Sequence, residues 1–516
     1  MAKEIRQAVS QTKAPEFKLE SDQTRQLIEF MKSNHVPLPK WEEVVAPHAH
    51  HYFPESDAVG VQYPPGTGLT LAIFPEGRAI YDLNRVVVVI LTLAGVLAIV
   101  AAGWKRAWRS AALAILGVQI GLSILARIGT VSFSINASLV PLLLSVLITL
   151  AALRLRNLDR QRSAWLTALA GGAVLGFAVL IRITTLLLVP GLLVLLWPKL
   201  RPFRFSNLVL PLMLALFVVG VVPVLWHQQQ IAGAWYLPTY GRIDATLPTI
   251  SRIEHHLSYY FSDEFAAQDN WAVLLAAIGF AGFAMLIAEI TNAHGENGFG
   301  LNWKRLGVAA LVLWIFPTVF FLSHAVLGMH YAMPTTFAVV TLIGFGSLAI
   351  EATGKHRPDR AGKLRPRWLA GCALIVIAAL GGLTHAWRER TAMPVPAQPL
   401  VHVEDPLPAE LNDSKSWIWA DFLTGTLWYY HQKTSFKISF TDADVRAMIF
   451  RFVFERGEQQ YLIRDSETME QFMSEVSQLG GTLEQRGTID GQPFFLIHWP
   501  KNGPALKSQP NHVVMD

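Results

Sequence analysis

The chain has 516 residues, of which 52% are hydrophobic and only 16% are charged, and its mean hydropathy is +0.35. Soluble domains carry about 25% charged residues, so this balance indicates a polytopic membrane protein with some aqueous mass. In a membrane protein, a net charge of +5 mainly reflects basic residues in the loops, which indicate the orientation of the chain. It is only weak evidence for nucleic-acid binding, and we expect no nucleic-acid partner. A single cysteine, Cys372, excludes an intrachain disulfide framework.

The first 85 residues are polar and precede the first long apolar run. Their first basic residues are not followed by the apolar segment that a signal peptide requires, so we expect no signal peptide at this start. Their most unusual stretch is HAHHYFPESDAVGVQYPPGTG at 48–68, followed by LTLAIF. The two prolines after Tyr63 hold the backbone extended, and Gly66 then permits a tight turn. We expect TGLTLAIF to form a short interfacial helix whose first amides suit a phosphate; an ordinary interfacial loop and helix is the alternative.

Ten apolar runs are long enough, or nearly so, for a membrane-spanning helix of about 20 residues. They lie at 86–104, 110–126, 136–153, 163–181, 183–198, 208–226, 271–289, 306–327, 332–350 and 368–386, with those at 110–126 and 183–198 the shortest. We therefore predict a polytopic α-helical membrane protein of about ten spans.

Basic residues gather in alternate connections between these runs, and these connections face the cytoplasm by the positive-inside rule. They lie at 105–109, 154–162, 199–204, 304–305 and 355–367. The outer face then receives residues 1–85, the loop at 227–270 and the tail at 387–516. An outer N-terminal region needs something to carry it across the membrane. We expect that an upstream first helix precedes this sequence; a miscounted span is the alternative.

The tail from about residue 400 predicts a small extramembrane α/β domain. Strand-like clusters at 416–421, 436–440, 460–465 and 494–499 alternate with helix-like stretches at 422–433, 442–456 and 467–479. Gly480-Gly481 predicts a helix end and Asp490-Gly491 a hairpin turn. The chain thus divides into an outer-face region with an interfacial helix (1–85), a transmembrane helical domain (86–390) and, after a Pro-rich linker, a periplasmic α/β domain (400–516).

Two motifs resemble the GT-C superfamily of membrane glycosyltransferases. The acidic region that ends in YPPG and leads to a short helix is similar to the first outer loop of that superfamily, and GGAVLGFAVLIRITTLLLVP at 171–190 is similar to its glycine-rich helix ending in Arg. The likeness extends to the branches of protein O-mannosyltransferases, aminoarabinose transferases and rhizobial galacturonosyltransferase-like enzymes. It covers roughly residues 20–390, and the family's first helix is absent from this sequence.

The resemblance implies transfer of a sugar from a polyprenyl-phosphate donor to an envelope glycan, lipid or protein acceptor at the outer leaflet of the bacterial inner membrane. A carboxylate suits the base that accepts the acceptor's hydroxyl proton. Asp22 resembles the acid that the family places early in the first outer loop, and Asp57, six residues before Tyr63, is the second candidate. The alternative for both is a solvated surface acid.

The leaving polyprenyl phosphate needs cations or oriented amides. Arg182, between two apolar runs at their outer ends, is costly unless functional, although snorkelling to the headgroups is the alternative. Arg242 is a weaker candidate in the second outer loop. Tyr63 and Gly66 complete the predicted donor-binding elements.

Histidines and aromatic residues gather in the same outer segments. His50, His51, His255 and His256 are expected to hydrogen-bond to sugar hydroxyls or phosphate, or to be structural. Their spacing matches no established metal motif, so no cofactor is required and a divalent metal is the less favoured alternative. The aromatic residues around Trp235 and Tyr236 suit sugar stacking, but we assign them mostly to a membrane-interface belt.

Two other functions compete with sugar transfer. A transporter or flippase predicts polar or charged residues inside the spans, and the runs contain few, chiefly Gln119 and Asn136. A polysaccharide polymerase also works at the outer face, but it needs no Pro-Pro-led interfacial helix. The sequence therefore favours a polyprenyl-phosphate-sugar-dependent glycosyltransferase.

Overall fold

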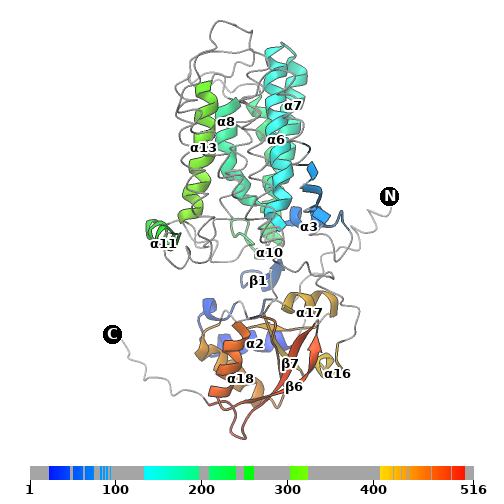
Figure 1. The fold of residues 1–516 in the computed structure, drawn as a ribbon, viewed down its shortest axis with the longest axis vertical. Coiled ribbons are helices and arrows are strands. Elements are labelled where there is room, and N and C mark those ends of the chain that lie inside the picture. The colour runs from blue at the N-terminus through cyan, green and yellow to red at the C-terminus, as the bar shows by residue number, and fades with distance from the viewer. Residues whose placement is uncertain are drawn as a thin grey trace. The chain divides into compact units, whose positions relative to one another are not determined.

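The computed structural model describes residues 22–42, 44–46, 50–61, 64–74, parts of 82–93, 133–196, 208–239, 249–260, 303–323 and most of 407–505. The chain divides into two compact units, drawn with their elements in Figure 1. Unit 1 consists of Met1–Gln62, Gln228–Arg242 and Gln398–Asp516, and unit 2 of Tyr63–His227 and Ile243–Ala397. The apolar runs expected at 110–126, 271–289, 332–350 and 368–386, and most of the run at 86–104, lie outside the described residues.

Unit 2 is helical in its described parts. Its elements are α3 (Pro65–Leu71), α6 (Phe133–Asn157), α7 (Gln161–Ile181), the 3₁₀ helix η2 (Ile183–Leu188), α8 (Val189–Leu196), α9 (Val209–Leu216), the π-helical turn η3 (Phe217–Val221), α10 (Val222–Ala232, whose last residues belong to unit 1), α11 (Ile250–Tyr260) and α13 (Trp303–Ser323).

Three of the described helical stretches are long and apolar enough to cross a membrane: Ala137–Arg156, Gln161–Ile181 and Val209–Ala232. The runs expected at 136–153, 163–181 and 208–226 are thus confirmed as candidate spans. The run at 183–198 forms an apolar helix too, but its described length, Ile183–Val194, is shorter. Arg182 adopts an extended conformation that ends α7, and the next helical segment begins after it as the 3₁₀ helix η2.

Small residues on α7 allow unusually close helix contacts in unit 2. A Cβ atom on Gly172 would lie 2.1 Å from the carbonyl oxygen of Leu212 in α9. Gly176 faces Gly220 in the π-helical turn η3, and its carbonyl oxygen lies 2.6 Å from the Cβ position of Gly220. On the other side of α7, Ser145 of α6 donates to the carbonyl of Gly171 at 3.1 Å. Such close approach maximises packing where water provides no hydrophobic driving force.

Unit 1 contains a five-stranded mixed sheet in the order β4-β3-β5-β7-β6. Its strands are β3 (Trp417–Ala420), β4 (Phe436–Lys437), β5 (Gln460–Ile463), β6 (Thr482–Ile489) and β7 (Gln492–His498), and its helices are α16 (Ala409–Asn412), α17 (Leu423–His431), α18 (Ala443–Glu455) and α19 (Thr468–Gln478). β3 pairs in parallel with β4 and β5, and β7 pairs antiparallel with β5 and β6. The strands and helices expected in the tail are all present, and the hairpin turn expected at Asp490-Gly491 joins β6 to β7. The bounds of β6 were not predicted, and α16 is additional.

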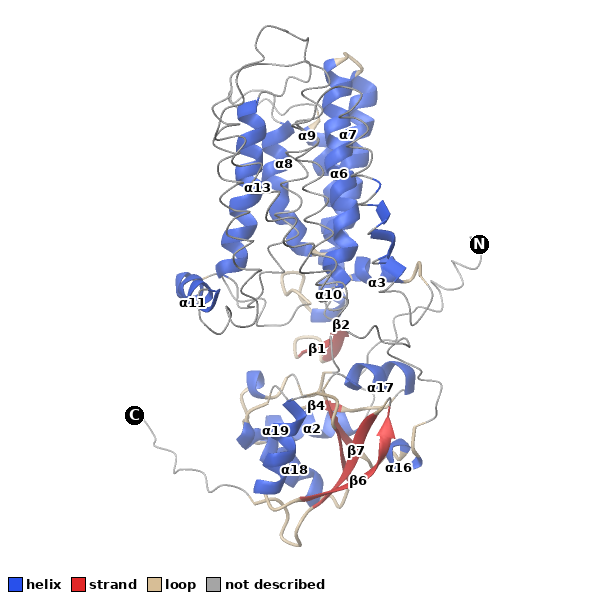
Figure 2. Ribbon diagram, viewed as in Figure 1, coloured by secondary structure: helices blue, strands red, loops and turns tan. Residues whose placement is uncertain are grey.

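Side chains alternate across β3 and build a core on each face of the sheet. Trp417 and Trp419 are fully buried in a cluster with Phe450 of α18, and Ile418 belongs to a second cluster with Leu427 of α17. Because β4 and β5 flank β3 on opposite sides, right-handed crossovers place α17 and α18 on opposite faces. Figure 2 shows α2, α18 and α19 together on one side of the sheet.

The N-terminal region folds onto this same domain. Its elements are α2 (Asp22–Ser33), the 3₁₀ helix η1 (Leu38–Lys40) and a hairpin of β1 (His50–Phe53) and β2 (Ala58–Val61). Leu27 and Met31 of α2 are fully buried in the core that contains Trp417, and Phe30 stacks on Phe452 with ring centroids 4.3 Å apart. The sequence analysis treated residues 1–85 and 400–516 as separate regions, whereas residues 22–62 share a core with the α/β tail.

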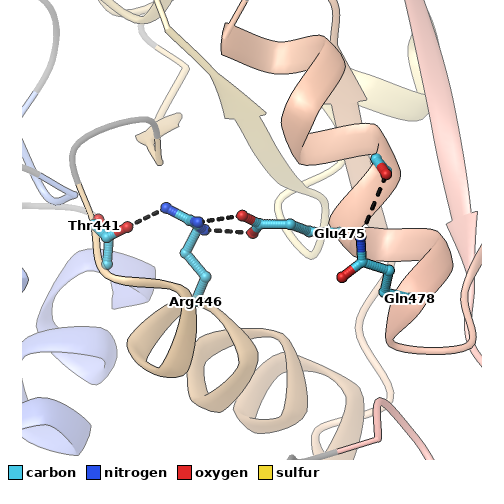
Figure 3. Close-up of polar contacts among 5 residues, drawn as sticks. Thr441, Arg446, Glu475 and Gln478 are labelled. Carbon is cyan, nitrogen blue, oxygen red and sulfur yellow. Dashed lines mark hydrogen bonds and ion pairs between the residues drawn. The ribbon is translucent and has the colours of Figure 1, made fainter.

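Polar contacts strengthen these junctions. The edge strand β4 donates a backbone hydrogen bond to the N-terminal region, from Lys437 N to Val44 O at 3.0 Å. Figure 3 shows that the guanidinium of Arg446 in α18 donates hydrogen bonds to both carboxylate oxygens of Glu475 in α19 and to the carbonyl of Thr441. The Arg446 and Glu475 side chains are only 14% and 29% exposed, so this pair links two helices in a partly desolvated position.

Candidate functional site

The Pro-Pro-Gly element and the end of α7 form a close backbone contact within unit 2. α3 begins at Pro65, where the fixed φ of proline suits a first helical turn, and it packs on α7 (Figure 1). A Cβ atom on Gly66 would lie 2.5–2.6 Å from the backbone of Leu180 and Ile181, so only glycine fits there. Thr67, 2% exposed, donates its hydroxyl to the carbonyl of Ile181 at 2.9 Å. Two motifs about 114 residues apart therefore meet.

Arg182 follows directly after this contact. It is 8% exposed, and its extended backbone ends α7. Its Nε atom donates to Oγ1 of Thr184 at 2.9 Å, which orients the guanidinium, and the amide of Thr185 donates to its carbonyl. The Thr185 hydroxyl in turn donates to the carbonyl of Ala178 at 3.3 Å. Arg182 is thus a buried arginine at a helix break, directly after the contact with the Pro-Pro-Gly element.

His255 and His256 lie on α11, also in unit 2. His256 is 2% exposed, whereas His255 is exposed, and their ring centroids are 6.0 Å apart. α11 packs on α13, and the amide of Thr249 donates to the carbonyl of Ser323 at 3.2 Å. His256 is thus buried, and His255 is the one that presents its ring to the surface.

Asp22 lies in unit 1 as the first residue of α2, where it is exposed. A carboxylate at this position interacts favourably with the positive end of the helix dipole. The next residue, Gln23, is buried and donates to the carbonyl of Ser416 at 3.3 Å. This anchors the start of α2, and with it Asp22, to the α/β domain.

Asp57 lies in the turn of the β1–β2 hairpin in unit 1. It is exposed and has φ of 49°, a left-handed conformation that aspartate tolerates better than most residues. The buried Tyr52 donates its hydroxyl to Oδ1 of Asp57 at 2.7 Å. Burial, reinforced by the neighbouring Asp57 carboxylate, raises the pKa of Tyr52 above its usual value, so its proton stays on the tyrosine. Sequence reasoning missed Tyr52, because nothing local marks it as the partner of Asp57.

The remaining histidine candidates lie on the same hairpin. His50 and His51 are half-buried in β1 and pair with Val61 and Gly60 of β2. Tyr63 and Arg242 lie outside the described residues. Unit 1 thus holds Asp22, His50, His51 and Asp57, and unit 2 holds Gly66, Arg182, His255 and His256. Across the described ranges, no three His, Cys, Asp or Glu side chains are grouped closely enough to hold a metal ion.

A second acidic position in unit 1 lies at the carboxyl ends of β3 and β5, where ligands bind in many open α/β sheets. Asp465 accepts the amide of Leu423 at 2.7 Å and that of Asp421 at 3.0 Å, so it caps the start of α17. Burial raises the pKa of Asp465, while these backbone hydrogen bonds act in the opposite direction. The carboxylate is engaged in holding α17 to the sheet, and we assign it a structural role.

Comparisons with protein-family models, with curated proteins and with solved structures find no match to this chain.

Proposed function

We propose that this protein is a membrane glycosyltransferase that moves a sugar from a polyprenyl-phosphate donor to an envelope glycan, lipid or protein acceptor at the periplasmic face of a bacterial inner membrane. The contact of Gly66 and Thr67 with the backbone just before Arg182 carries this proposal. In it, Arg182 binds the phosphate that leaves when the acceptor hydroxyl attacks the anomeric carbon. Asp57 or Asp22 accepts the hydroxyl proton.

Phosphate binding suits Arg182 on physical grounds. A guanidinium presents a planar fork of donors that matches two phosphate oxygens, and a partly desolvated site strengthens that interaction. The hydrogen bond to Thr184 holds the fork before the donor arrives, so less entropy is lost on binding. Charge that develops on the leaving phosphate is then stabilised by a group that needs no reorganisation.

Unit 1 is built from three separate segments of the chain, and this supports placing its acids on one side of the membrane. A folded unit with loops and sheet cannot straddle the hydrocarbon layer, so its three chain segments share one side. The chain must then cross an even number of times between residues 62 and 228, and again between 242 and 398. The apolar runs satisfy this condition, with six between 86 and 226 and four between 271 and 386. The basic connections assign that side to the periplasm.

The experiment is turnover by the purified full-length protein in lipid nanodiscs, with a panel of polyprenyl-phosphate-linked sugars and a membrane glycolipid extract as acceptor. We expect Asp57→Asn to abolish transfer if Asp57 is the base, and Asp22→Asn to do so if Asp22 is. Glu29→Gln, an exposed acid on the same helix as Asp22, is the matched control and should retain activity. Full activity in both aspartate variants removes the base assignment.

The competing functions give different results in the same system. A flippase moves the lipid-linked sugar between leaflets of a vesicle without breaking the bond between sugar and phosphate. A polymerase extends one glycan by repeated units. Release of polyprenyl phosphate with single-sugar addition to an acceptor separates the proposed activity from both.

A further inference from the structure

Two exposed aromatic rings form the most conspicuous surface feature of unit 1. Among the described residues of that unit, three large apolar side chains are exposed: Val61, Trp235 and Tyr236, at 40%, 58% and 65%. The rings of Trp235 and Tyr236 meet edge to face with centroids 5.7 Å apart. The other large apolar chains of this part of the protein lie in cores or are partly covered. Large rings gathered on a water-facing surface indicate a binding site.

The loop that carries these rings is braced. The side chain of Gln229 donates to the carbonyl of Gly233 at 2.9 Å and accepts the amide of Trp235 at 3.1 Å. The amide of Leu237 donates to the carbonyl of Ala234 at 3.1 Å. Gly233 has φ of 78°, which favours glycine and turns the chain out of α10. The aromatic pair is therefore presented on a preorganised loop, which lowers the entropy lost on binding.

The hairpin turn packs against this loop and brings acidic groups to it. Ser56 donates its hydroxyl to the carbonyl of Ile231 at 2.6 Å. The Cβ position of Gly233 lies 3.0 Å from the carbonyl carbon of Glu55, so the loop and the turn are in backbone contact. Glu55 and Asp57 are both exposed on that turn. An aromatic surface thus lies beside a turn that carries two carboxylates.

This combination selects a neutral saccharide. The C–H faces of a sugar ring stack on Trp and Tyr, and sugar hydroxyls donate to carboxylates. Residues 50–61 and 228–239 contain two acids and no Lys or Arg, so their charge disfavours phosphate and anionic lipid headgroups.

The position of the loop along the chain also argues against a membrane-interface belt. Polar residues begin at His227 in α10, directly after the exposed Trp226, and continue through Gln230. Helical rise then adds about 9 Å between Trp226 and the end of α10 at Ala232. That is more than the roughly 5–7 Å depth of one headgroup layer. The polar residues that follow Trp226 separate it along the chain from the loop, so we assign Trp226, and not Trp235, to the belt.

We propose that Trp235 and Tyr236, with the Glu55–Asp57 turn, form a saccharide-binding subsite that holds the acceptor. This rests on the proposed function and narrows the acceptor class from glycan, lipid or protein to a carbohydrate-bearing molecule. Trp235 and Tyr236 hold the acceptor without taking part in bond making, so occupancy of the subsite is measurable without turnover.

The first test is binding of the full-length protein in nanodiscs to an array of immobilised neutral oligosaccharides. Trp235→Ala should weaken binding by about ten-fold or more, whereas Trp226→Ala, the matched exposed tryptophan, should leave it unchanged. A wild-type protein that binds no oligosaccharide, or equal binding by Trp235→Ala, overturns the proposal. Because this readout needs no donor, glycan binding in a protein without transferase activity refutes the proposed function and leaves the subsite standing.

The second test addresses a lipid surface as the occupant. A nitroxide is attached at Tyr236→Cys in a Cys372→Ser background, and its accessibility to a water-soluble nickel chelate is compared with its accessibility to oxygen. We expect preference for the nickel chelate at position 236 and for oxygen at Trp226→Cys. Preference for oxygen at position 236 places the ring in the bilayer and overturns the saccharide assignment.

Discussion

Replacing Gly66 by alanine tests the corner between the Pro-Pro-Gly element and α7. The new Cβ atom would lie 2.5 Å from the carbonyl carbon of Leu180, whereas ordinary van der Waals contact begins near 3.4 Å. α3 must therefore move by about 0.9 Å, the difference between these two distances. A displacement of that size along the Thr67–Ile181 hydrogen bond, now 2.9 Å, lengthens it beyond useful range.

The expected cost follows from two contributions. Overpacking against backbone atoms that cannot rotate away costs about 1–3 kcal/mol. Loss of the buried hydrogen bond costs about 0.5–1.5 kcal/mol more. The helix preference of alanine over glycine offsets at most about 1 kcal/mol, so the net loss in the free energy of unfolding is about 0.5–4.5 kcal/mol. Gly68, on the same short helix, has no atom within 4 Å of its Cβ position and is the matched control.

The assay is unfolding of the full-length protein in detergent by SDS titration, followed by tryptophan fluorescence, for both alanine variants. Gly66→Ala should unfold at a lower SDS fraction than wild type, and Gly68→Ala at an equal or higher one. Equal stability of the two variants refutes the close contact between α3 and α7 and, with it, the observation that carries the proposed function.

Three further predictions concern unit 1. Arg446→Met should lower the free energy of unfolding by about 1–3 kcal/mol, because it leaves the partly buried carboxylate of Glu475 without its ion-pair partner. Loss of the exposed ion pair between Arg451 and Glu455 should lower it by only about 0.3–0.5 kcal/mol. Equal losses for the two variants in urea unfolding contradict the bidentate geometry of the Arg446–Glu475 pair. Leu27→Ala should cost about 2–5 kcal/mol and expose the α/β domain to protease, and an unchanged digestion pattern is incompatible with α2 as part of its core. Tyr52→Phe should cost about 1 kcal/mol at pH 7 through the lost bond to Asp57. Because the pKa of Tyr52 is raised in the folded state, wild type loses stability as pH rises above about 10, where the unfolded tyrosine ionises. The stability of Tyr52→Phe should depend less on pH in this range. Parallel stability–pH curves for the two proteins exclude the raised pKa.

Sequence patterns predicted the elements whose signals are local. The helices at 136–153, 163–181 and 208–226 follow from length and apolar composition, and β3 and β5 from short apolar clusters bounded by polar residues. The turn at Asp490-Gly491 predicted a hairpin, but the strand before it, β6, was not delimited, because its exposed face carries Glu484 and Arg486 and no apolar alternation marks this edge strand.

Long-range partners were not predictable from the sequence. A helix at α2 was not predicted within the polar residues 1–85, and no local signal indicates that Trp417 and Phe452, about 400 residues away, cover it. The same holds for the hairpin turn at Asp57, which packs on the loop after α10. By contrast, the Pro-Pro-Gly motif and Arg182 could be recognised from the sequence alone. Proline restricts the backbone, and an arginine in an apolar segment is energetically unfavourable unless a partner compensates its charge.

The most direct measurement of the central claim is donor turnover by Arg182→Gln in nanodiscs, beside wild type and Arg162→Gln, an exposed arginine in the first turn of α7. We predict that wild type and Arg162→Gln release polyprenyl phosphate from a lipid-linked sugar, whereas Arg182→Gln is about 100-fold slower or more while it remains folded. Equal turnover in all three proteins would contradict this prediction.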